Sequence, residues 1–213
     1  MPPLLITILV GFFVGSFLTS VIDRNVNASE SVFLIRCITA MLFAMMAIRL
    51  DGGITVAAFC VLMSGLLVLT FIDLRTHRLP REVTYIVMGV GAVLLSVAAI
   101  VDDQPRRMYM AALGAVISVS VMSVLYLLSR GGLGDGDVRM SPLLGMYLGW
   151  LNPGLALVGL LYGFILAALV SAMLMILGTA NRRTAIAFGP FLAIGTLAAI
   201  LHGQVLIEIV RPS

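Results

Sequence analysis

Long runs of apolar residues recur along this sequence and leave it few ways to fold. A helix needs about 20 apolar residues to cross the hydrocarbon core of a bilayer, and backbone polar groups inside lipid must be paired internally. Of the 213 residues, 61% are hydrophobic and 11% are charged. The pattern predicts an all-α, polytopic membrane protein with about eight transmembrane helices in a single membrane-embedded domain, residues 1–213. The expected segments are about 4–22, 31–48, 54–74, 84–101, 108–129, 138–151, 153–178 and 185–209.

The sixth expected segment, about 138–151, is the exception in length. It is too short to span a membrane unless it is tilted or partly re-entrant, and Pro142 is expected in its first turns, where proline is tolerated. The first segment lacks a basic flank and a cleavage site, so we expect a retained helix and not a signal peptide. Cys37 and Cys60 each lie in an apolar segment and form no Cys-x-x-Cys pair, so no metal site is expected from them.

The basic residues, all 13 of them arginine, indicate an orientation. Links after the first, third, fifth and seventh segments carry seven arginines, and the remaining links and the tail carry four. The positive-inside rule therefore predicts an outside N-terminus, with the ends of segments three and five at the cytoplasmic face. Arginine near helix ends is explained by topology and lipid, so nucleic-acid binding is not expected.

Two aspartates are predicted to lie at this cytoplasmic boundary. Asp73 ends the third segment after a long uncharged run, and Asp137 opens the sixth within the glycine-rich stretch 131–140. Carboxylates this close to hydrocarbon are expensive and are kept mainly for function. Two neighbouring carboxylates share one proton and can perform acid–base work on a water molecule. We expect Asp137 to be the more acidic partner, because it lies at a helix N-terminus.

Other interpretations of these residues stay open. Asp135 also carries a carboxylate two positions from Asp137, although such a residue is more often a solvated turn residue. His77 is more often an interfacial group than a ligand. Intramembrane aspartates, a broken helix at Pro142 and abundant glycine also suit a small transporter or ion-translocating protein. A catalytically inactive scaffold for pilus assembly is a further alternative.

Four short motifs occur in order along nearly the whole chain. They are Gly15-Ser16-Phe17-Leu18 with Arg24, Asp73 followed by Leu79-Pro80, Gly134-Asp135-Gly136-Asp137 followed by Val138-Arg139, and Phe188-Gly189-Pro190-Phe191. Together with the expected helix count, this set resembles the bacterial type IV prepilin peptidases, which are eight-helix membrane aspartyl proteases of the Gly-x-Gly-Asp class.

The resemblance implies roles for the matching residues. Asp73 and Asp137 would be the catalytic pair, and Arg139 would take the basic position after the second aspartate, which is usually lysine. The residues implied in substrate binding or loop shape are Gly134, Asp135, Gly136, Arg139, Pro80, Gly189 and Pro190. Asp135 fills the variable position of the motif with an extra acid, and Arg81 stands where many members have asparagine or aspartate.

The resemblance also implies a substrate and a place in the cell. The substrates would be prepilin or pseudopilin precursors, cut after the glycine that ends a basic leader, at the cytoplasmic face of the bacterial inner membrane. Longer members of the family carry a cysteine-rich insertion between the first two helices and methylate the new N-terminus. That link is short and cysteine-free here, as in the peptidases of Flp-type pilus systems, so neither a cofactor nor methylation is expected. The oligomeric state is not indicated.

Overall fold

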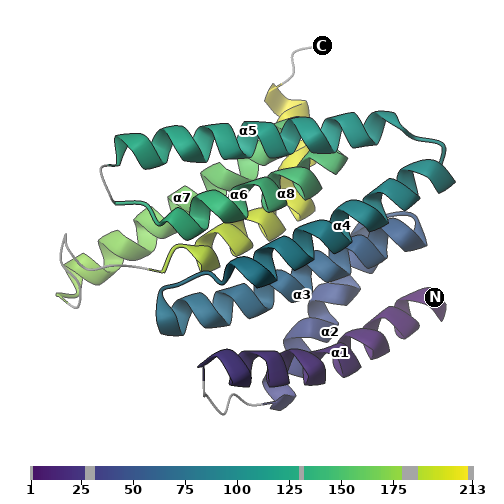
Figure 1. The fold of residues 1–213 in the computed structure, drawn as a ribbon, viewed down its shortest axis with the longest axis horizontal. Helices are drawn as coiled ribbons and strands as arrows, with labels where there is room; N and C mark the ends of the chain where they lie inside the picture. The colour runs from purple at the N-terminus through teal and green to yellow at the C-terminus, as the bar shows by residue number, and fades with distance from the viewer. Residues whose placement is uncertain (1, 27–31, 130–131, 179–186, 211–213) are drawn as a thin grey trace.

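The regular structure of the described residues consists of α-helices. The computed structural model describes residues 2–26, 32–129, 132–178 and 187–210. Its helices are α1 (Pro2–Val26), α2 (Val32–Arg49), α3 (Gly53–Thr76), α4 (Arg81–Val101), α5 (Arg106–Leu128), α6 (Asp135–Leu151), α7 (Pro153–Ile176) and α8 (Gly189–Val210) (Figure 1). Each expected segment corresponds to one helix, so the predicted all-α class is confirmed.

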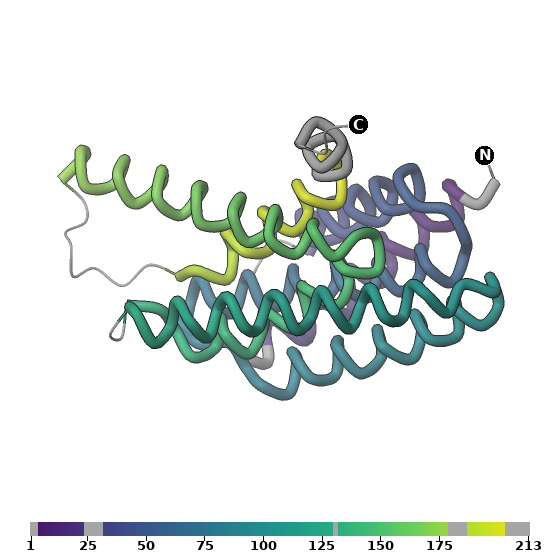
Figure 2. The backbone as a smooth tube through the Cα atoms, turned by 90° about the horizontal axis from the view of Figure 1, so that it is seen from above, coloured from purple at the N-terminus to yellow at the C-terminus, as the bar shows by residue number. Residues whose placement is uncertain are grey.

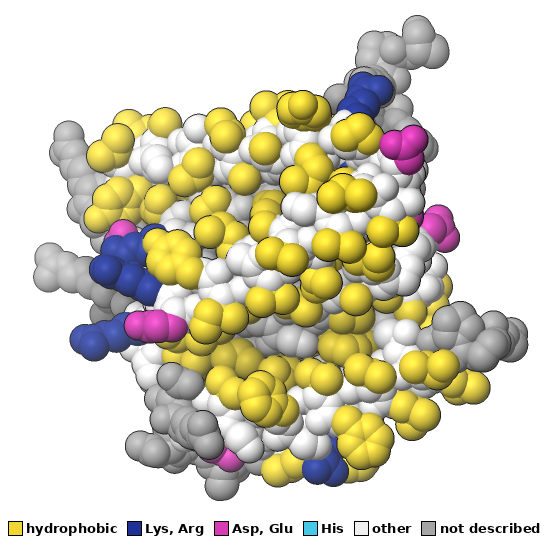
Figure 3. All heavy atoms as spheres, turned by 45° about the vertical axis from the view of Figure 1, so that its right-hand side comes forward, with side chains coloured by type: hydrophobic (Ala, Val, Ile, Leu, Met, Phe, Trp, Pro, Cys, Tyr) yellow, Lys and Arg dark blue, Asp and Glu magenta, His cyan; other side chains and the backbone are white. Residues whose placement is uncertain are grey.

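The surface of the molecule is apolar in the way that lipid requires. Six helices of the described chain, α1 to α5 and α7, are long and apolar enough to cross a membrane. The short sixth segment is confirmed, since α6 has 17 residues, and the described apolar part of α8 covers Gly189–His202. Figure 3 shows hydrophobic side chains over most of one face, with charged side chains toward its edges. The protein is therefore a polytopic membrane protein.

Neighbours in the chain pack as antiparallel pairs, namely α1 with α2, α3 with α4, α5 with α6, and α7 with α8. Helix α3 contacts α1, α2, α4 and α8, and it is the most buried of the six long spans. The view in Figure 2 shows α7 and the start of α8 beside each other, to one side of α5 and α6. A buried α3 places its C-terminal end, which carries Asp73, inside the bundle.

Glycines let α5 and α6 approach at backbone distance. A Cβ added at Gly114 in α5 would lie 2.6 Å from Cα of Gly149 and would also meet the carbonyl oxygen of Gly145. Gly145 and Gly149 are four residues apart, so both lie on the same face of α6. Small residues spaced in this way are the usual basis of close helix packing in membranes. This contact fixes α6, and hence Asp137, against α5.

Helix α6 begins at Asp135, three residues before the predicted start. Its first turn contains two acids, which the positive end of the helix favours, and Asp135 pairs with Arg139 one turn later. Pro142 consequently lies in the helix interior and not in the first turns. Proline cannot donate to the carbonyl of Val138, but the Ser141 hydroxyl donates to that oxygen at 2.8 Å. The side chain next to the proline thus satisfies the carbonyl that the proline leaves free.

Candidate active site

The two predicted acids meet in one cavity. This cavity has a volume of about 810 Å³ and lies where α3 ends and α6 begins. Asp73 and Asp137 both line it, and their side chains are 5% and 6% exposed. Its walls come from six parts of the chain: the ends of α3 and α5, the loop before α6, the first turn of α6, the middle of α7 and the residues leading into α8. The remaining lining residues are His77, Leu125, Leu128, Ser129, Gly132, Leu133, Gly134, Phe164, Ala167, Ala168, Ser171, Ala187 and Phe188.

Asp73 is held by the start of α8. The backbone N–H of Gly189, the first residue of α8, donates to Oδ2 of Asp73 at 2.8 Å. A helix N-terminus carries free N–H groups and a partial positive charge, so this contact favours the carboxylate form of Asp73. Helix α3 ends at Thr76, and the next residue, His77, donates its backbone N–H to the carbonyl of Asp73 and then leaves the helix with a left-handed backbone (φ 52°). The predicted importance of Gly189 thus has a geometric basis that joins two distant motifs.

Asp137 is the third helical residue of α6. Burial and the neighbouring Asp73 carboxylate raise the pKa of Asp137, while a hydrogen bond from the backbone N–H of Gly134 acts in the opposite direction. Desolvation therefore outweighs the helix terminus, which the sequence alone suggested would make Asp137 the more acidic partner. Burial of Asp137 thus opposes the expectation that it is the more acidic partner, and the Gly189 N–H stabilises the carboxylate form of Asp73.

The loop between α3 and α4 presses against the first turn of α6. A Cβ added at Gly136 would lie 3.0 Å from Cβ of Leu79, so any larger residue would press on this side chain. Pro80 follows as the residue that caps α4, with an extended backbone. The glycines at 134 and 136 allow the side chains of Asp137 and Leu79 to lie close to the backbone. They are not needed for a left-handed backbone, since Gly134 is extended with φ −73°. This contact brings the two acid-bearing helix ends together.

Six predicted residues do not line the cavity: Pro80, Gly136 and Gly189, whose contacts are described above, and Asp135, Arg139 and Pro190. Asp135 is exposed and its carboxylate forms an ion pair with Arg139 on the surface of α6. Pro190 is buried in the first turn of α8 and faces α2 and α3, where it lines a separate small cavity with Leu66 and Thr70. The structure thus separates Asp135, the alternative acid, from the pair formed by Asp73 and Asp137.

Sequence reasoning missed the wall that α7 contributes. Phe164, Ala167, Ala168 and Ser171 all line the cavity, and their spacing of three, four and seven residues places them on one helix face. A stripe of small residues beside a phenylalanine was the available signal. It did not stand out because alanine, serine and glycine are common in membrane helices for packing alone.

The fold and this site define a class: a polytopic membrane protein with two buried carboxylates from different helices in one cavity. Residues 60–177 match the model of the type IV leader peptidase family. The chain belongs to this family.

Proteins with similar sequences are named as leader peptidases. The chain is 31% identical over 176 residues to a prepilin leader peptidase/N-methyltransferase of Aeromonas salmonicida strain A449, covering 80% of this chain and 58% of that protein. It is 30% identical over 177 residues to the protein of that name in Escherichia coli K12, covering 79% of this chain and 72% of the relative. The chain thus spans less than two thirds of the Aeromonas relative. No solved structure matches the chain at a significant level.

Proposed function

We propose that this protein is an intramembrane aspartyl endopeptidase that removes the leader from prepilin-like precursors. The observation that carries the proposal is the pair of buried carboxylates, Asp73 and Asp137, in one cavity at the same end of the bundle. Buried acids with perturbed ionisation in a cleft are characteristic of catalytic sites. Membership of the type IV leader peptidase family supports the same reaction.

In the proposed mechanism the resting pair holds one proton, on Asp137, and the Asp73 carboxylate is stabilised by the Gly189 N–H. The Asp73 carboxylate takes a proton from a water molecule as the water oxygen attacks the scissile carbonyl carbon, and Asp137 gives its proton to the carbonyl oxygen. When the tetrahedral intermediate collapses, the C–N bond breaks. Asp73 then protonates the leaving amine, and Asp137 recovers the proton of the gem-diol hydroxyl. The pair ends with the single proton with which it began.

The cavity suits an extended segment with apolar side chains. Phe164 and Phe188 line it together with small residues of α7, so the wall offers both aromatic contacts and room for substrate side chains. In the proposed reaction the precursor's apolar helix enters from the lipid and its basic leader stays in water. Cleavage after the leader glycine is what the family resemblance implies, and the relatives' name of prepilin leader peptidase supports removal of a leader.

The direct test is cleavage of a precursor by the purified chain in lipid nanodiscs. We expect two products whose masses place the cut after the leader glycine. The precursor should span the leader and the first apolar helix, and several prepilins and pseudopilins should be tried. If every precursor stays intact while the protein is folded and monodisperse, the peptidase proposal fails, and ion or solute transport through the aspartates becomes the function to test.

We propose that the cavity faces the cytoplasm of a bacterial inner membrane and that the N-terminus lies outside. The arginine distribution supports this orientation. Single cysteines in place of Ser129 and Asp51, in a chain without Cys37 and Cys60, probe the two ends of the bundle. An impermeant maleimide should label Asp51→Cys in intact spheroplasts, and Ser129→Cys only after the membrane is opened. The reverse labelling pattern contradicts the orientation.

Gly189→Ala should slow cleavage by about a hundredfold, the scale of a catalytic group displaced by about 1 Å. An added Cβ would lie 2.8 Å from Oδ2 and 3.3 Å from Cγ of Asp73, so the carboxylate must move away from the backbone N–H. The measurement is the cleavage rate at saturating precursor. Gly89→Ala is the matched control, because nothing lies within 4 Å of its added Cβ. Equal rates for the two variants contradict this role.

A further inference from the structure

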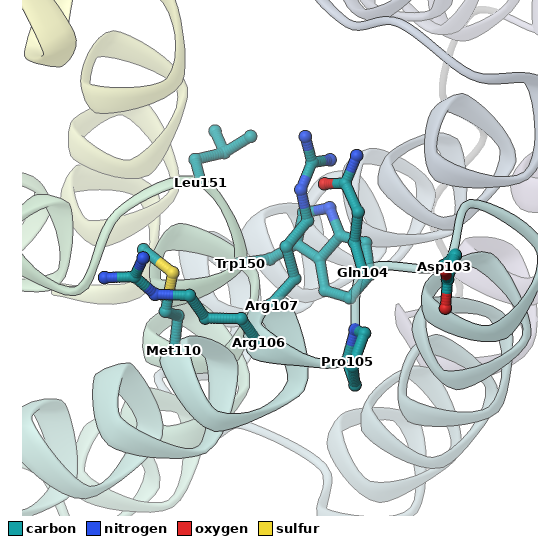
Figure 4. Close-up of a pocket in the computed structure, with 8 residues that line it drawn as sticks. All are labelled: Asp103, Gln104, Pro105, Arg106, Arg107, Met110, Trp150 and Leu151. Atoms are coloured by element: carbon teal, nitrogen blue, oxygen red, sulfur yellow. The ribbon is translucent and has the colours of Figure 1, made fainter.

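A second polar pocket lies at the opposite end of the bundle from the two acids. Its volume is about 590 Å³, and it lies where α4 gives way to α5 and where α6 ends (Figure 4). The residues lining it are Asp103, Gln104, Pro105, Arg106, Arg107, Met110, Trp150 and Leu151. None of them belongs to the cavity that holds Asp73 and Asp137, so the proposed peptidase reaction does not account for this pocket.

Positive charge is concentrated at this pocket. Helix α5 begins with Arg106 and Arg107 and has no acid in its first turn, although a helix N-terminus favours negative charge. Within the described residues neither guanidinium forms an ion pair, and Asp103 is the one acid that lines the pocket. Figure 4 shows the Arg107 guanidinium near the indole nitrogen and the Arg106 guanidinium pointing the other way, past Met110. Both charges lie at the positive end of α5, and a bound anion would offset them.

The indole N–H of Trp150 lacks a hydrogen-bond acceptor among the described residues, which is an independent indication that this pocket holds a ligand. The Trp150 side chain is 1% exposed. The guanidinium carbon of Arg107 lies 5.6 Å from the centre of the indole ring. Figure 4 shows the indole nitrogen on the side where Gln104 and Arg107 lie. A buried N–H without an acceptor is costly, and an acceptor oxygen in this pocket would satisfy it.

We propose that this pocket binds a phosphate group through Arg107 and the indole N–H of Trp150, and that the exposed Arg106 side chain turns from its place beside Met110 to contact the same group. Guanidinium groups bind phosphate with paired hydrogen bonds, and the Gln104 amide adds another donor beside them. Met110 and Leu151 make part of the wall apolar, as a glycerol backbone or the start of an acyl chain requires. The pocket lies at helix ends, which is the depth of the lipid headgroups. The phosphate therefore comes from an anionic phospholipid in the leaflet opposite the catalytic pair, or from the free ion.

The chain reports on this pocket directly, because Trp150 is its one tryptophan. Full-length protein in a neutral detergent is titrated with dihexanoyl phosphatidylglycerol, with dihexanoyl phosphatidylcholine and with inorganic phosphate at constant ionic strength. We expect a saturable change in tryptophan emission with phosphatidylglycerol. An equal response to inorganic phosphate at similar concentration identifies the free ion as the source. The phosphate of phosphatidylcholine is balanced by its choline cation, so an equal response to this lipid, or no saturable response to any probe, overturns the proposed binding of an anion.

Substitutions then locate the response. Arg106→Gln and Arg107→Gln should each raise the half-saturating concentration about tenfold, the scale of losing one charge-assisted contact. Arg107→Lys should have a half-saturating concentration between those of the unaltered chain and Arg107→Gln, because lysine keeps the positive charge but loses the planar guanidinium with its paired donors. Arg49→Gln is the matched control, since Arg49 ends α2 outside the pocket. Far-ultraviolet dichroism checks that each variant is folded. An unchanged midpoint in folded Arg106→Gln and Arg107→Lys overturns the proposed contacts.

Discussion

Asp73→Asn and Asp137→Asn should each lower the rate of precursor cleavage at least about a thousandfold. A positioned acid or base contributes about 10²–10⁴ in rate, and residues that act as one unit lose most of that contribution together when either is removed. Asparagine at position 73 cannot take the proton from water, and asparagine at position 137 cannot release one to the carbonyl oxygen. The double variant should therefore be little slower than either single variant. The measurement is single-turnover cleavage of one precursor by equal amounts of folded protein.

Two further substitutions make this experiment specific. Asp135→Asn removes a carboxylate two residues from Asp137 that is exposed and paired with Arg139 outside the cavity. Asp51→Asn removes an exposed carboxylate between α2 and α3, at the other end of the bundle. Both should cleave within a few-fold of the unaltered chain. A large loss in Asp135→Asn with activity kept in Asp137→Asn would move the proposed proton donor to Asp135.

The helices were predictable because lipid leaves few alternatives. Uninterrupted apolar runs have to form helices, and charges collect at the helix ends, so the sequence positions of the eight elements follow from hydropathy. The approach of Asp73 and Asp137 also follows, since an odd-numbered helix ends on the face where an even-numbered one begins. The role of Gly189 could only be inferred from family resemblance, because its hydrogen bond to Asp73 joins residues 116 positions apart.

The protonation of the pair could not be read from the sequence. A helix N-terminus is visible as a pattern, but the burial of Asp137 depends on helices that converge from distant parts of the chain. Burial and the proximity of Asp73 raise the pKa of Asp137 against the effect of the Gly134 N–H. The contribution of α7 to the cavity wall could not be predicted for a similar reason. Ala167 and Ser171 are recognised as lining residues only once the position of the cavity is known.

Gly114→Val should destabilise the fold by at least about 3 kcal/mol, the upper range for overpacking a close contact. The added Cβ would lie 2.6 Å from Cα and 3.0 Å from the backbone nitrogen of Gly149, and backbone atoms cannot rotate away as a side chain can. Helices α5 and α6 would have to separate, which would also displace Asp137 from its cavity. We expect a lower midpoint of thermal unfolding in detergent, followed by tryptophan emission, with loss of cleavage at temperatures that the unaltered chain tolerates.

Gly89→Val is the control that separates this contact from the general effect of valine in a membrane helix. Gly89 lies in the interior of α4, and nothing lies within 4 Å of its added Cβ. Valine there makes the same change in helix propensity as valine at position 114, but its Cβ meets no neighbour. Its unfolding midpoint should therefore stay close to that of the unaltered chain. If both valine variants unfold at the same temperature, the contact between α5 and α6 is looser than the backbone distances imply, and Asp137 must owe its position to Leu79 packing on Gly136.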